Sequence, residues 1–377
     1  MFRTLQLLPA LGDGGVERSA VEMAEFLGKR GVESWVASAG GPLVANIEKT
    51  GARHALIPVG VKSPIAMIGA AWKVARLIDS EQIDILHARS RAPAWVALLA
   101  RRLARRPTRF VTTFHGVYGH GNALKRFYNG GMLRTPIVIA NSLFIRDHVR
   151  SIYHYPAENI IVAPRGIDPE VFDPAALFLE TIASVRHELG AGPGKRLIVM
   201  VGRITGWKGH AVLLDAFASL ADPTLRLAFV GSGTDTTIAG IKEKTQALGI
   251  ADRVILTGSR RDIPAVLAAA DLAVSASTRP EAFGRAAIEA QAMETPVIAT
   301  DHGGSRETVI PGKTGWLVPP GDAEALAAAI RDALSDPSRL SEMGRLGRAH
   351  VLANFTKQSM LEKEYSAYER VMREPPR

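Results

Sequence analysis

The sequence predicts two α/β domains, each built around a parallel sheet with helices on both faces. Short apolar runs of strand length alternate with amphipathic segments of helical length in both halves of the chain. The chain has 377 residues, which is long for one hydrophobic core and typical of two domains. Because short apolar strands that alternate with helices form parallel sheets buried on both faces, two such series indicate two doubly wound domains.

The order of the expected elements is the same in both halves. In the first half, strands are expected at residues 4–8, 34–39, 54–59, 83–87, 110–114, 137–140 and 160–163. Helices are expected at residues 16–29, 64–79, 93–105 and 142–152. In the second half, strands are expected at residues 197–201, 225–230, 254–256, 272–275, 296–299 and 315–318. Helical segments between them include residues 209–220, 263–269, 285–293 and 323–334.

The domain boundary is expected within residues 168–194. Two prolines and a glycine-rich segment there are typical of a loop, although residues 177–189 have helical character. We therefore place the first domain at residues 1–170 and the second at 171–355. A last helical segment, residues 357–372, lies beyond the final strand, and its pattern is compatible with packing on either domain.

Composition excludes several classes of protein. The chain has no cysteine, so disulfides, thiolate metal sites and cysteine nucleophiles are excluded. Its start is already strand-like and lacks the apolar core of a signal peptide, and no run approaches transmembrane length. We therefore expect an intracellular, soluble, globular protein.

The positive charge lies in one half of the chain. Residues 1–165 contain 22 Lys and Arg against 11 Asp and Glu, whereas the remainder contains 24 against 26. The basic residues gather at the end of one predicted helix and shortly after it, at Arg101, Arg102, Arg105, Arg106, Arg109, Lys125, Arg126 and Arg134. This helix taken alone fits a solvated face opposite a core-facing stripe, and the uneven charge favours an anionic membrane surface. Nucleic acid is a weaker alternative, since stacking aromatic residues are not interleaved.

Two carboxylates stand at the start and in the second turn of one predicted helix. Glu281 follows a buried strand, where open α/β sheets bind ligands, and Glu289 lies among small apolar residues. A carboxylate in such surroundings needs hydrogen-bond donors. The free amides of Phe283, Gly284 and Arg285 are expected at the same place. Carboxylates beside free amides suit a ligand with many hydroxyl groups and an anionic group, such as a nucleotide sugar.

In each half of the chain, a glycine-containing turn follows the first strand. In the second half, Gly202, Arg203 and Lys208 place two cations at a strand-to-helix turn, which suits a pyrophosphate. A loop with two solvated cations is the alternative. In the first half, Gly14 and Gly15 occupy the matching turn, where a ligand can approach the backbone closely.

Histidine and arginine residues end two other strands of the first half. His115 ends the strand at 110–114 and precedes a glycine, which suits either a cleft or a structural role. His87, Arg89 and Arg91 end the strand at 83–87, where acceptor binding and a surface ion pair are both compatible. No Asp-x-Asp pair is present, so we expect no divalent metal at a diphosphate.

Taken together, these motifs resemble those of the family 4 retaining glycosyltransferases of the GT-B type. The resemblance covers nearly the whole chain and rests on the pair Glu281 and Glu289, the Gly202–Gly209 turn and the Gly14-Gly15 loop. It also rests on residues 296–299, Gly303-Gly304, Glu307, 312–318 and 320–322. Residues 87–95 and 125–129 contribute to a narrower similarity to bacterial enzymes of lipopolysaccharide and envelope-glycan assembly.

The resemblance implies a fold and a set of roles. It implies two Rossmann-like domains facing across a cleft, the first for the acceptor and the second for the donor, with the C-terminal helix (356–377) returning to the first. Glu281 would bind the donor sugar, Glu289 the ribose, and Arg203 and Lys208 the diphosphate. His115 would lie beside the donor sugar. The other implied donor-site positions are Gly14, Gly15, Gly202, Arg260, Ala282, Phe283, Gly284 and Arg285.

The chain departs from the family at three positions, Ala282, Glu294 and Arg165. The first two stand where glycine is common, and Arg165 replaces a frequent asparagine in the expected hinge. The expected reaction is a metal-independent, retaining transfer of a sugar from a nucleotide-diphosphate donor to a glycan or glycolipid hydroxyl, at the inner face of the cytoplasmic membrane. The alternatives are a sugar-nucleotide hydrolase or epimerase and a non-catalytic membrane-bound scaffold.

Overall fold

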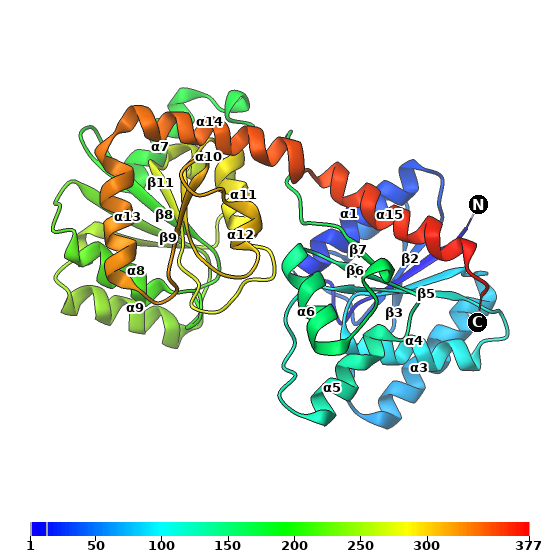
Figure 1. The fold of residues 1–377 in the computed structure, drawn as a ribbon. Coiled ribbons are helices and arrows are strands. Elements are labelled where there is room, and N and C mark those ends of the chain that lie inside the picture. Colours follow the sequence, from blue (N-terminus) through cyan, green and yellow to red (C-terminus); the bar gives the residue numbers. More distant parts are fainter. Residues whose placement is uncertain (1, 13, 377) are drawn as a thin grey trace. The chain divides into compact units, whose positions relative to one another are not determined.

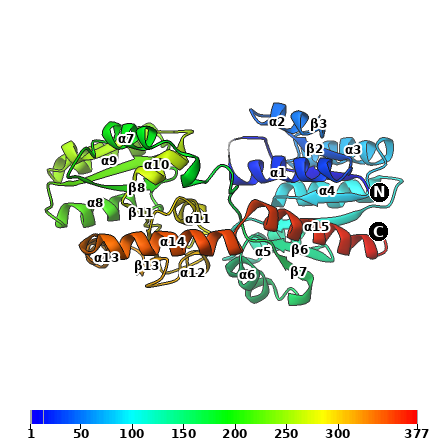
Figure 2. The ribbon, with the colours of Figure 1, turned by 90° about the horizontal axis from the view of Figure 1, so that it is seen from above.

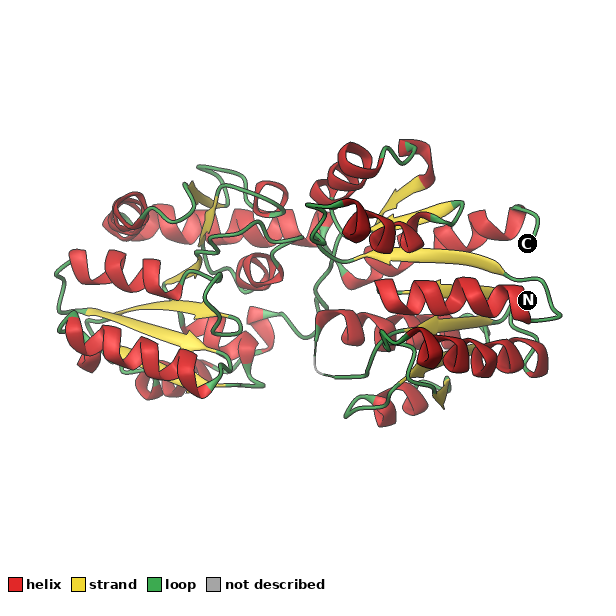
Figure 3. Cartoon of the chain, turned by 90° about the horizontal axis from the view of Figure 1, so that it is seen from below, coloured by secondary structure: helices red, strands yellow, loops and turns green. Residues whose placement is uncertain are grey.

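The computed structural model describes residues 2–12 and 14–376, and the chain divides into two compact units. Unit 1 comprises residues 1–164 and 360–377, and unit 2 comprises residues 165–359. Each unit contains a parallel sheet that lies between two layers of helices (Figures 1 and 3). The predicted fold class, two doubly wound α/β domains, is confirmed.

The sheet of unit 1 has the strand order β3-β2-β1-β4-β5-β6-β7, with every described pair parallel. Its strands are short and rich in β-branched and other apolar residues, so most are buried on both faces. The strands are β1 (Thr4–Leu7), β2 (Ser34–Ser38), β3 (Arg53–Leu56), β4 (Ile85–Ala88), β5 (Arg109–Phe114), β6 (Ile137–Ala140) and β7 (Ile160–Val162). The order reverses between β1 and β4, and ligands bind at such points in open sheets.

The helices of unit 1 cover both faces of this sheet. α3 and α4 pack against each other, whereas α1 shares a buried cluster with the C-terminal helix. The helices are α1 (Gly15–Lys29), α2 (Val44–Lys49), α3 (Pro64–Ser80), α4 (Arg91–Leu103), α5 (Ala123–Asn129), α6 (Leu143–Tyr153) and α15 (Lys357–Arg373), with 3-10 turns η1 (Gly130–Leu133) and η2 (Ala157–Asn159). Side-chain caps begin some of them; the Ser142 hydroxyl, for example, accepts the amide of Ile145 (3.0 Å).

The sheet of unit 2 has the order β10-β9-β8-β11-β12-β13 and is also parallel. Its strands are β8 (Arg196–Val201), β9 (Leu225–Val230), β10 (Val254–Gly258), β11 (Leu272–Ser275), β12 (Val297–Thr300) and β13 (Gly315–Val318). The order reverses between β8 and β11. The loops that follow these two strands therefore start side by side, at the edge where a ligand site is expected.

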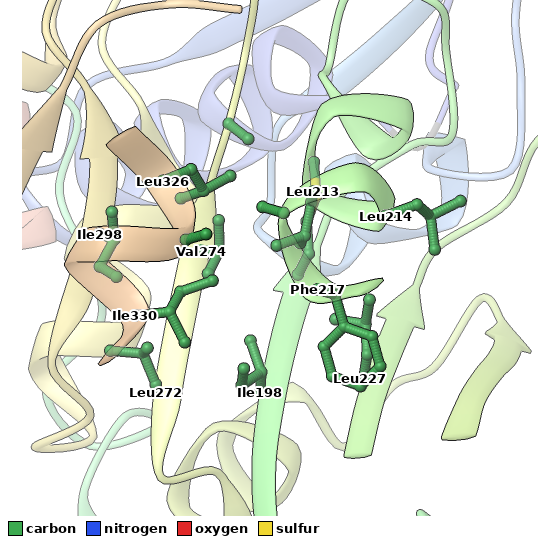
Figure 4. Packing of buried hydrophobic residues seen from close by; sticks show 14 of the residues in the cluster. Ile198, Leu213, Leu214, Phe217, Leu227, Leu272, Val274, Ile298, Leu326 and Ile330 are labelled. Atoms are coloured by element: carbon green, nitrogen blue, oxygen red, sulfur yellow. The ribbon is translucent and has the colours of Figure 1, made fainter. Parts of the chain in front are cut away.

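Helices of unit 2, among them α8 and α13, pack on one face of its sheet over a large hydrophobic cluster (Figure 4). In this cluster Ile198, Phe217 and Ile330, from β8, α8 and α13, are fully buried. The helices are α7 (Leu179–Glu188), α8 (His210–Ser219), α9 (Asp235–Ala247), α10 (Ile263–Ala269), α11 (Arg285–Ala292), α12 (Ser305–Thr308), α13 (Ala323–Ser335) and α14 (Pro337–Asn354), with 3-10 turns η3 (Pro174–Ala176) and η4 (Ala251–Arg253).

The C-terminal helix α15 packs in unit 1, where it lies beside α1 (Figures 1 and 2). Its Tyr368 is fully buried and its hydroxyl is 2.7 Å from Nδ1 of His87 on β4. Its Glu364 pairs with Arg89. The sequence pattern left the placement of this helix open, and the structure confirms the placement that the family resemblance implied.

Candidate active site

Three loops of unit 2 hold most of the predicted site residues. They follow β8, β11 and β12, which are neighbours in the sheet, so their carboxyl ends lie at one edge. The first loop carries Arg203 and Lys208, the second carries Glu281, and the third carries His302 and Gly303. The rule that functional loops follow strand ends therefore places residues from distant parts of the chain together.

Glycine residues allow these loops to approach each other closely. A Cβ atom at Gly209, where φ is +84°, would lie 1.8 Å from the carbonyl oxygen of Ala276. A Cβ atom at Gly303, where φ is +58°, would lie 2.4 Å from the carbonyl oxygen of Glu281. That same oxygen accepts the amide of Gly304 (2.9 Å). A side chain at Gly209 or Gly303 would therefore push the loops apart.

Lys208 and Glu281 form an ion pair at the centre of this arrangement. Nζ of Lys208 lies 2.8 Å from Oε1 of Glu281, and the hydroxyl of Ser277 donates to the same oxygen at 2.5 Å. The side chains of Lys208 and Glu281 are 19% and 13% exposed, so the pair is sheltered and still reachable. Two donors fix one carboxylate oxygen of Glu281. Two of the predicted site residues are thus in direct contact.

Glu289 and Arg285 form a second pair on α11. They lie one helical turn apart, with Nη2 of Arg285 3.1 Å from Oε1 of Glu289. Glu289 is 15% exposed, whereas its neighbour Ile288 is fully buried in the core. Gly284, with φ at +90°, is the N-cap of this helix. The second predicted carboxylate therefore has a cation partner within its own helix.

Arg203 and Arg260 differ in how far their charges are engaged. The side chain of Arg203 is exposed, and within residues 2–12 and 14–376 no ion pair or hydrogen bond of its guanidinium is seen. Arg260 is held by the carboxylates of Glu188 (3.1 Å) and Asp262 (2.5 Å), and these hydrogen bonds raise its pKa. Arg203 is therefore available to an anionic ligand. The place of Arg260 in the donor site stays a prediction.

Three polar residues of this site were not singled out from the sequence. Ser277 lies just past β11 and His302 just past β12, so the strand-end rule applied to every strand would have found both. Among the described residues, the ring nitrogens of His302 make no hydrogen bond, and the third residue, His210, is buried at the start of α8. Burial, and then the charge of Lys208, lower the pKa of His210 to about 4, so its ring is neutral at pH 7.

Unit 1 has its own strand-end residues. Gly14 is the N-cap of α1 and Gly15 begins the helix, in the turn that follows β1. His115 directly follows β5, and its carbonyl oxygen accepts the side-chain amide of Asn141 (3.2 Å). The placement of His115 after a sheet strand is as the sequence indicates, and its role stays a prediction.

Arg89 does not have the surface role expected of it. Its side chain is fully buried, with Nη2 2.8 Å from Glu364 of α15 and Nε 2.7 Å from the side-chain oxygen of Gln6. A guanidinium enclosed in this way cannot meet an acceptor or a membrane. The guanidinium of Arg91 lies over the ring of Tyr118, 4.4 Å from its centroid, and burial raises the pKa of that tyrosine to about 12.

The predicted basic cluster is partly structural and partly exposed. Arg101 donates to the carbonyl oxygen of Thr108 (2.8 Å), and Arg106 pairs with Asp84 (2.5 Å). These two charges serve the fold of unit 1. Arg109 is half-buried and donates to the carbonyl oxygen of Glu374 (3.0 Å). The remaining members are exposed, namely Arg102, Arg105, Lys125, Arg126 and Arg134.

The structure adds two findings on metals and membranes. In the described part of the chain, no cluster of three or more histidine or carboxylate side chains is arranged to hold a metal ion. No described helix combines the length and the apolar character needed to cross a bilayer.

The chain matches two family descriptions. Residues 13–171 match Glycosyltransferase Family 4, and residues 182–350 match Glycosyl transferases group 1. A GDP-mannose-dependent alpha-(1-6)-phosphatidylinositol monomannoside mannosyltransferase of Mycolicibacterium smegmatis is 31% identical over 76% of this chain and 76% of that protein. A lipopolysaccharide core biosynthesis mannosyltransferase of Rhizobium leguminosarum is 30% identical over 75% and 76%. A D-inositol 3-phosphate glycosyltransferase of Segniliparus rotundus is 36% identical over 60% of this chain, which spans only 51% of that relative.

Solved structures are similar over the full length. A glycosyltransferase from Rickettsia africae has a TM-score of 0.91 at 34% identity and covers 99% of both chains. Anabaena HepE, solved with UDP-glucose, has a TM-score of 0.86 at 24% identity over 98% of this chain and 100% of that one, which shows a shared fold.

Proposed function

The chain belongs to the family 4 glycosyltransferases with the GT-B fold, and from this premise we propose a retaining transfer from a nucleotide-diphosphate sugar to a hydroxyl of a glycan or glycolipid. The observation that carries the proposal is the Lys208–Glu281–Ser277 contact beside the exposed Arg203. It joins a fixed carboxylate, which suits sugar hydroxyls, to two cations, which suit a diphosphate.

Each residue then has a definite part in binding the donor. Glu281 accepts hydrogen bonds from sugar hydroxyls through the carboxylate oxygen that Lys208 and Ser277 leave accessible. Arg203 and Lys208 bind the diphosphate, and the amides at the start of α11 point toward it. Glu289, held by Arg285, binds the ribose hydroxyls. His115, in unit 1, is assigned to the donor sugar from the family resemblance alone.

The chemistry follows from where charge develops. The bond between the anomeric carbon and the diphosphate oxygen breaks heterolytically, which leaves an oxocarbenium-like sugar and a negative charge on the phosphate. Arg203 and Lys208 stabilise that charge without reorganisation, an effect of a few kcal/mol for each group. The acceptor hydroxyl attacks on the same face and passes its proton to the leaving phosphate. The new bond therefore keeps the anomeric configuration.

We also propose a lipid-linked or envelope-glycan acceptor and peripheral association with the inner face of the cytoplasmic membrane. The relatives that act on lipopolysaccharide core and on a phosphatidylinositol monomannoside support the first part. The exposed Arg102, Arg105, Lys125 and Arg126 support the second. On α5, Leu124 is 76% exposed and directly precedes Lys125 and Arg126 in the sequence.

Purified variants test the reaction. We expect Glu281→Gln and Lys208→Ala to lower kcat by about 10²–10³, because each removes a group that acts on developing charge or on sugar orientation. Exposed Glu243→Gln and Lys242→Ala on α9 are matched controls and should leave the rate unchanged. A panel of nucleotide sugars screened by thermal shift identifies the donor, since bound ligand raises stability.

Other outcomes would contradict the proposal. Near-wild-type turnover of both Glu281→Gln and Lys208→Ala excludes this site. Full-rate release of nucleotide without any acceptor indicates a hydrolase, and tight donor binding without turnover on envelope extract indicates a non-catalytic scaffold.

A further inference from the structure

Helix α3 of unit 1 exposes a row of large apolar side chains. Ile65 is 84% exposed, Ile68 is 51% exposed and Trp72 is 52% exposed. Their spacing of three and four residues puts them on one face of the helix. We call these three residues the α3 stripe. A soluble helix usually presents polar side chains to water, so this row is unpartnered within unit 1.

The stripe is separate from the face with which α3 packs into unit 1. The buried residues of α3 lie on the other side of the helix, and they are Ala70, Ala71, Val74, Ala75 and Ile78. These small and branched side chains let α3 pack closely against α4. The core therefore does not need the α3 stripe, and its exposure requires another explanation.

Exposed cations lie along one side of the stripe. Lys62, Lys73 and Arg76 are exposed on or just before α3. The one carboxylate of α3, Asp79, accepts the backbone amides of Arg105 (3.0 Å) and Arg106 (2.9 Å), so it is engaged at the far end of the helix. The apolar row thus has exposed cations near it, and the one carboxylate within α3 lies at the far end of the helix.

A groove continues the stripe toward the end of α4. It has a volume of about 530 Å³ and is lined by Trp72, Arg76, Leu103 and Arg105, together with Ala75, Asp79 and Ser80. Leu103 is itself 37% exposed. Trp72 and Leu103 are the large apolar residues of this lining, and its charged residues are two arginines and the engaged Asp79. This combination is suited to an acyl chain next to a phosphate-bearing headgroup.

We propose that α3 lies in the plane of an anionic lipid bilayer, with Ile65 and Ile68 inserted among the acyl chains and Trp72 at headgroup depth. A helix that lies in the interface has an apolar row, cationic borders and an amphipathic aromatic residue, as α3 has. The cations would repel each other across a symmetric contact with a second copy, whereas anionic lipid neutralises them. This inference deepens the proposed membrane association and rests on it.

Vesicle partitioning tests the inserted residues. With vesicles of equimolar phosphatidylcholine and phosphatidylglycerol, we expect the pair Ile65→Ser and Ile68→Ser to weaken partitioning of the full chain by about tenfold or more. Leu56→Ser on β3 is the matched control, because Leu56 is 70% exposed and lies outside the stripe. It should partition like the wild type. Equal partitioning of the stripe variant and the control would overturn the inference.

Tryptophan emission tests the orientation. The wild-type emission should move to shorter wavelength on vesicle addition, and Trp72→Phe should lose that shift while its partitioning stays near the wild-type value. A shift that persists in Trp72→Phe overturns the placement of this residue. The inference is also overturned if the wild type is a dimer in the absence of lipid and the Ile65→Ser and Ile68→Ser variant is a monomer that binds vesicles as the wild type does.

The readouts separate this inference from the proposed function. Thermal stabilisation by the donor reports on unit 2 and should be the same in the stripe variants and the wild type. Loss of insertion with intact donor binding supports the α3 inference alone. Wild-type protein that binds anionic and neutral vesicles equally, or without salt dependence, contradicts the proposed membrane association and the inference together.

Discussion

Two cation–glutamate pairs, one in unit 1 and one in unit 2, have the same separation and a different environment. Arg89–Glu364 and Lys208–Glu281 both have N–O distances of 2.8 Å. The first pair is fully buried and joins β4 to the C-terminal helix. The second keeps 19% and 13% of its side chains exposed at a strand-end loop. Burial, and not contact distance, separates a pair that holds the fold from a pair that can meet a ligand.

The contrast follows from desolvation. Two charges taken wholly out of water are compensated only by each other and by further hydrogen bonds, as from Arg89 to Gln6. They cannot exchange partners without a large penalty. Lys208 and Glu281 face water on one side, so a ligand can replace one charge as partner of the other. We therefore expect changes at the first pair to affect stability and changes at the second to affect turnover.

Breaking the buried pair should give the largest effect on stability. Arg89→Met leaves Glu364 charged and buried, and we expect a loss of about 3–5 kcal/mol in the free energy of unfolding. Denaturant unfolding measures it. Lys208→Met is the matched variant in unit 2, where the remaining carboxylate keeps access to water, and it should cost far less.

A double variant makes this comparison stricter. Arg89→Met combined with Glu364→Met removes both charges, so it should recover most of the stability lost in the single variant. If the single variant unfolds at the same denaturant concentration as the wild type, then burial does not distinguish the two pairs.

Acid should expose a second difference, through His210 near the Lys208–Glu281 pair. The pKa of His210 is about 4, lowered mainly by burial, against about 6.5 in an unfolded chain. Between pH 4 and pH 6.5, His210 is therefore protonated in the unfolded state and neutral in the folded state. The contribution of the neutral His210 ring to the free energy of unfolding is fully present above pH 6.5. It falls as the pH drops toward 4, by about 3 kcal/mol at most.

His210→Phe tests this dependence. The ring of His210 already packs edge-on against Phe229, with centroids 4.9 Å apart, so an apolar ring fits the same contacts. Unfolding measured from pH 7 to pH 4 should show a smaller loss in His210→Phe than in the wild type. Parallel curves for the two proteins would show that this ring does not carry the pH dependence.

The two pairs also show where sequence reading succeeds and where it stops. The strands are local apolar runs, so their order and the fold class are readable from the sequence. Lys208 and Glu281 are 73 residues apart and were nevertheless expected together, because both follow parallel strands. Arg89 also follows a strand, and its partner lies 275 residues away on a helix whose docking no local pattern fixes. Helix α9 is not among the helical segments named from the sequence. It buries only Ile241 and Thr245, so its apolar residues give no strong helical periodicity.

The smallest expected effect concerns Glu294, which lies two residues past the end of α11 and for which the family resemblance implies glycine. Its φ is +58°, in the left-handed region, while its side chain is exposed. An L-residue in this conformation costs about 1–2 kcal/mol of stability. Glycine avoids that cost, but it loses about 0.5–1 kcal/mol because its unfolded chain has more conformational entropy. We therefore expect Glu294→Gly to raise unfolding stability by about 1 kcal/mol or less, measured by thermal melting. Glu294→Ala keeps the Cβ atom and should give no gain. Neither change touches Glu281 or Glu289, so donor binding should stay constant in both variants, whereas Lys208→Ala should weaken it. If Glu294→Ala gains as much stability as Glu294→Gly, then the strain lies in the side chain and not in the backbone.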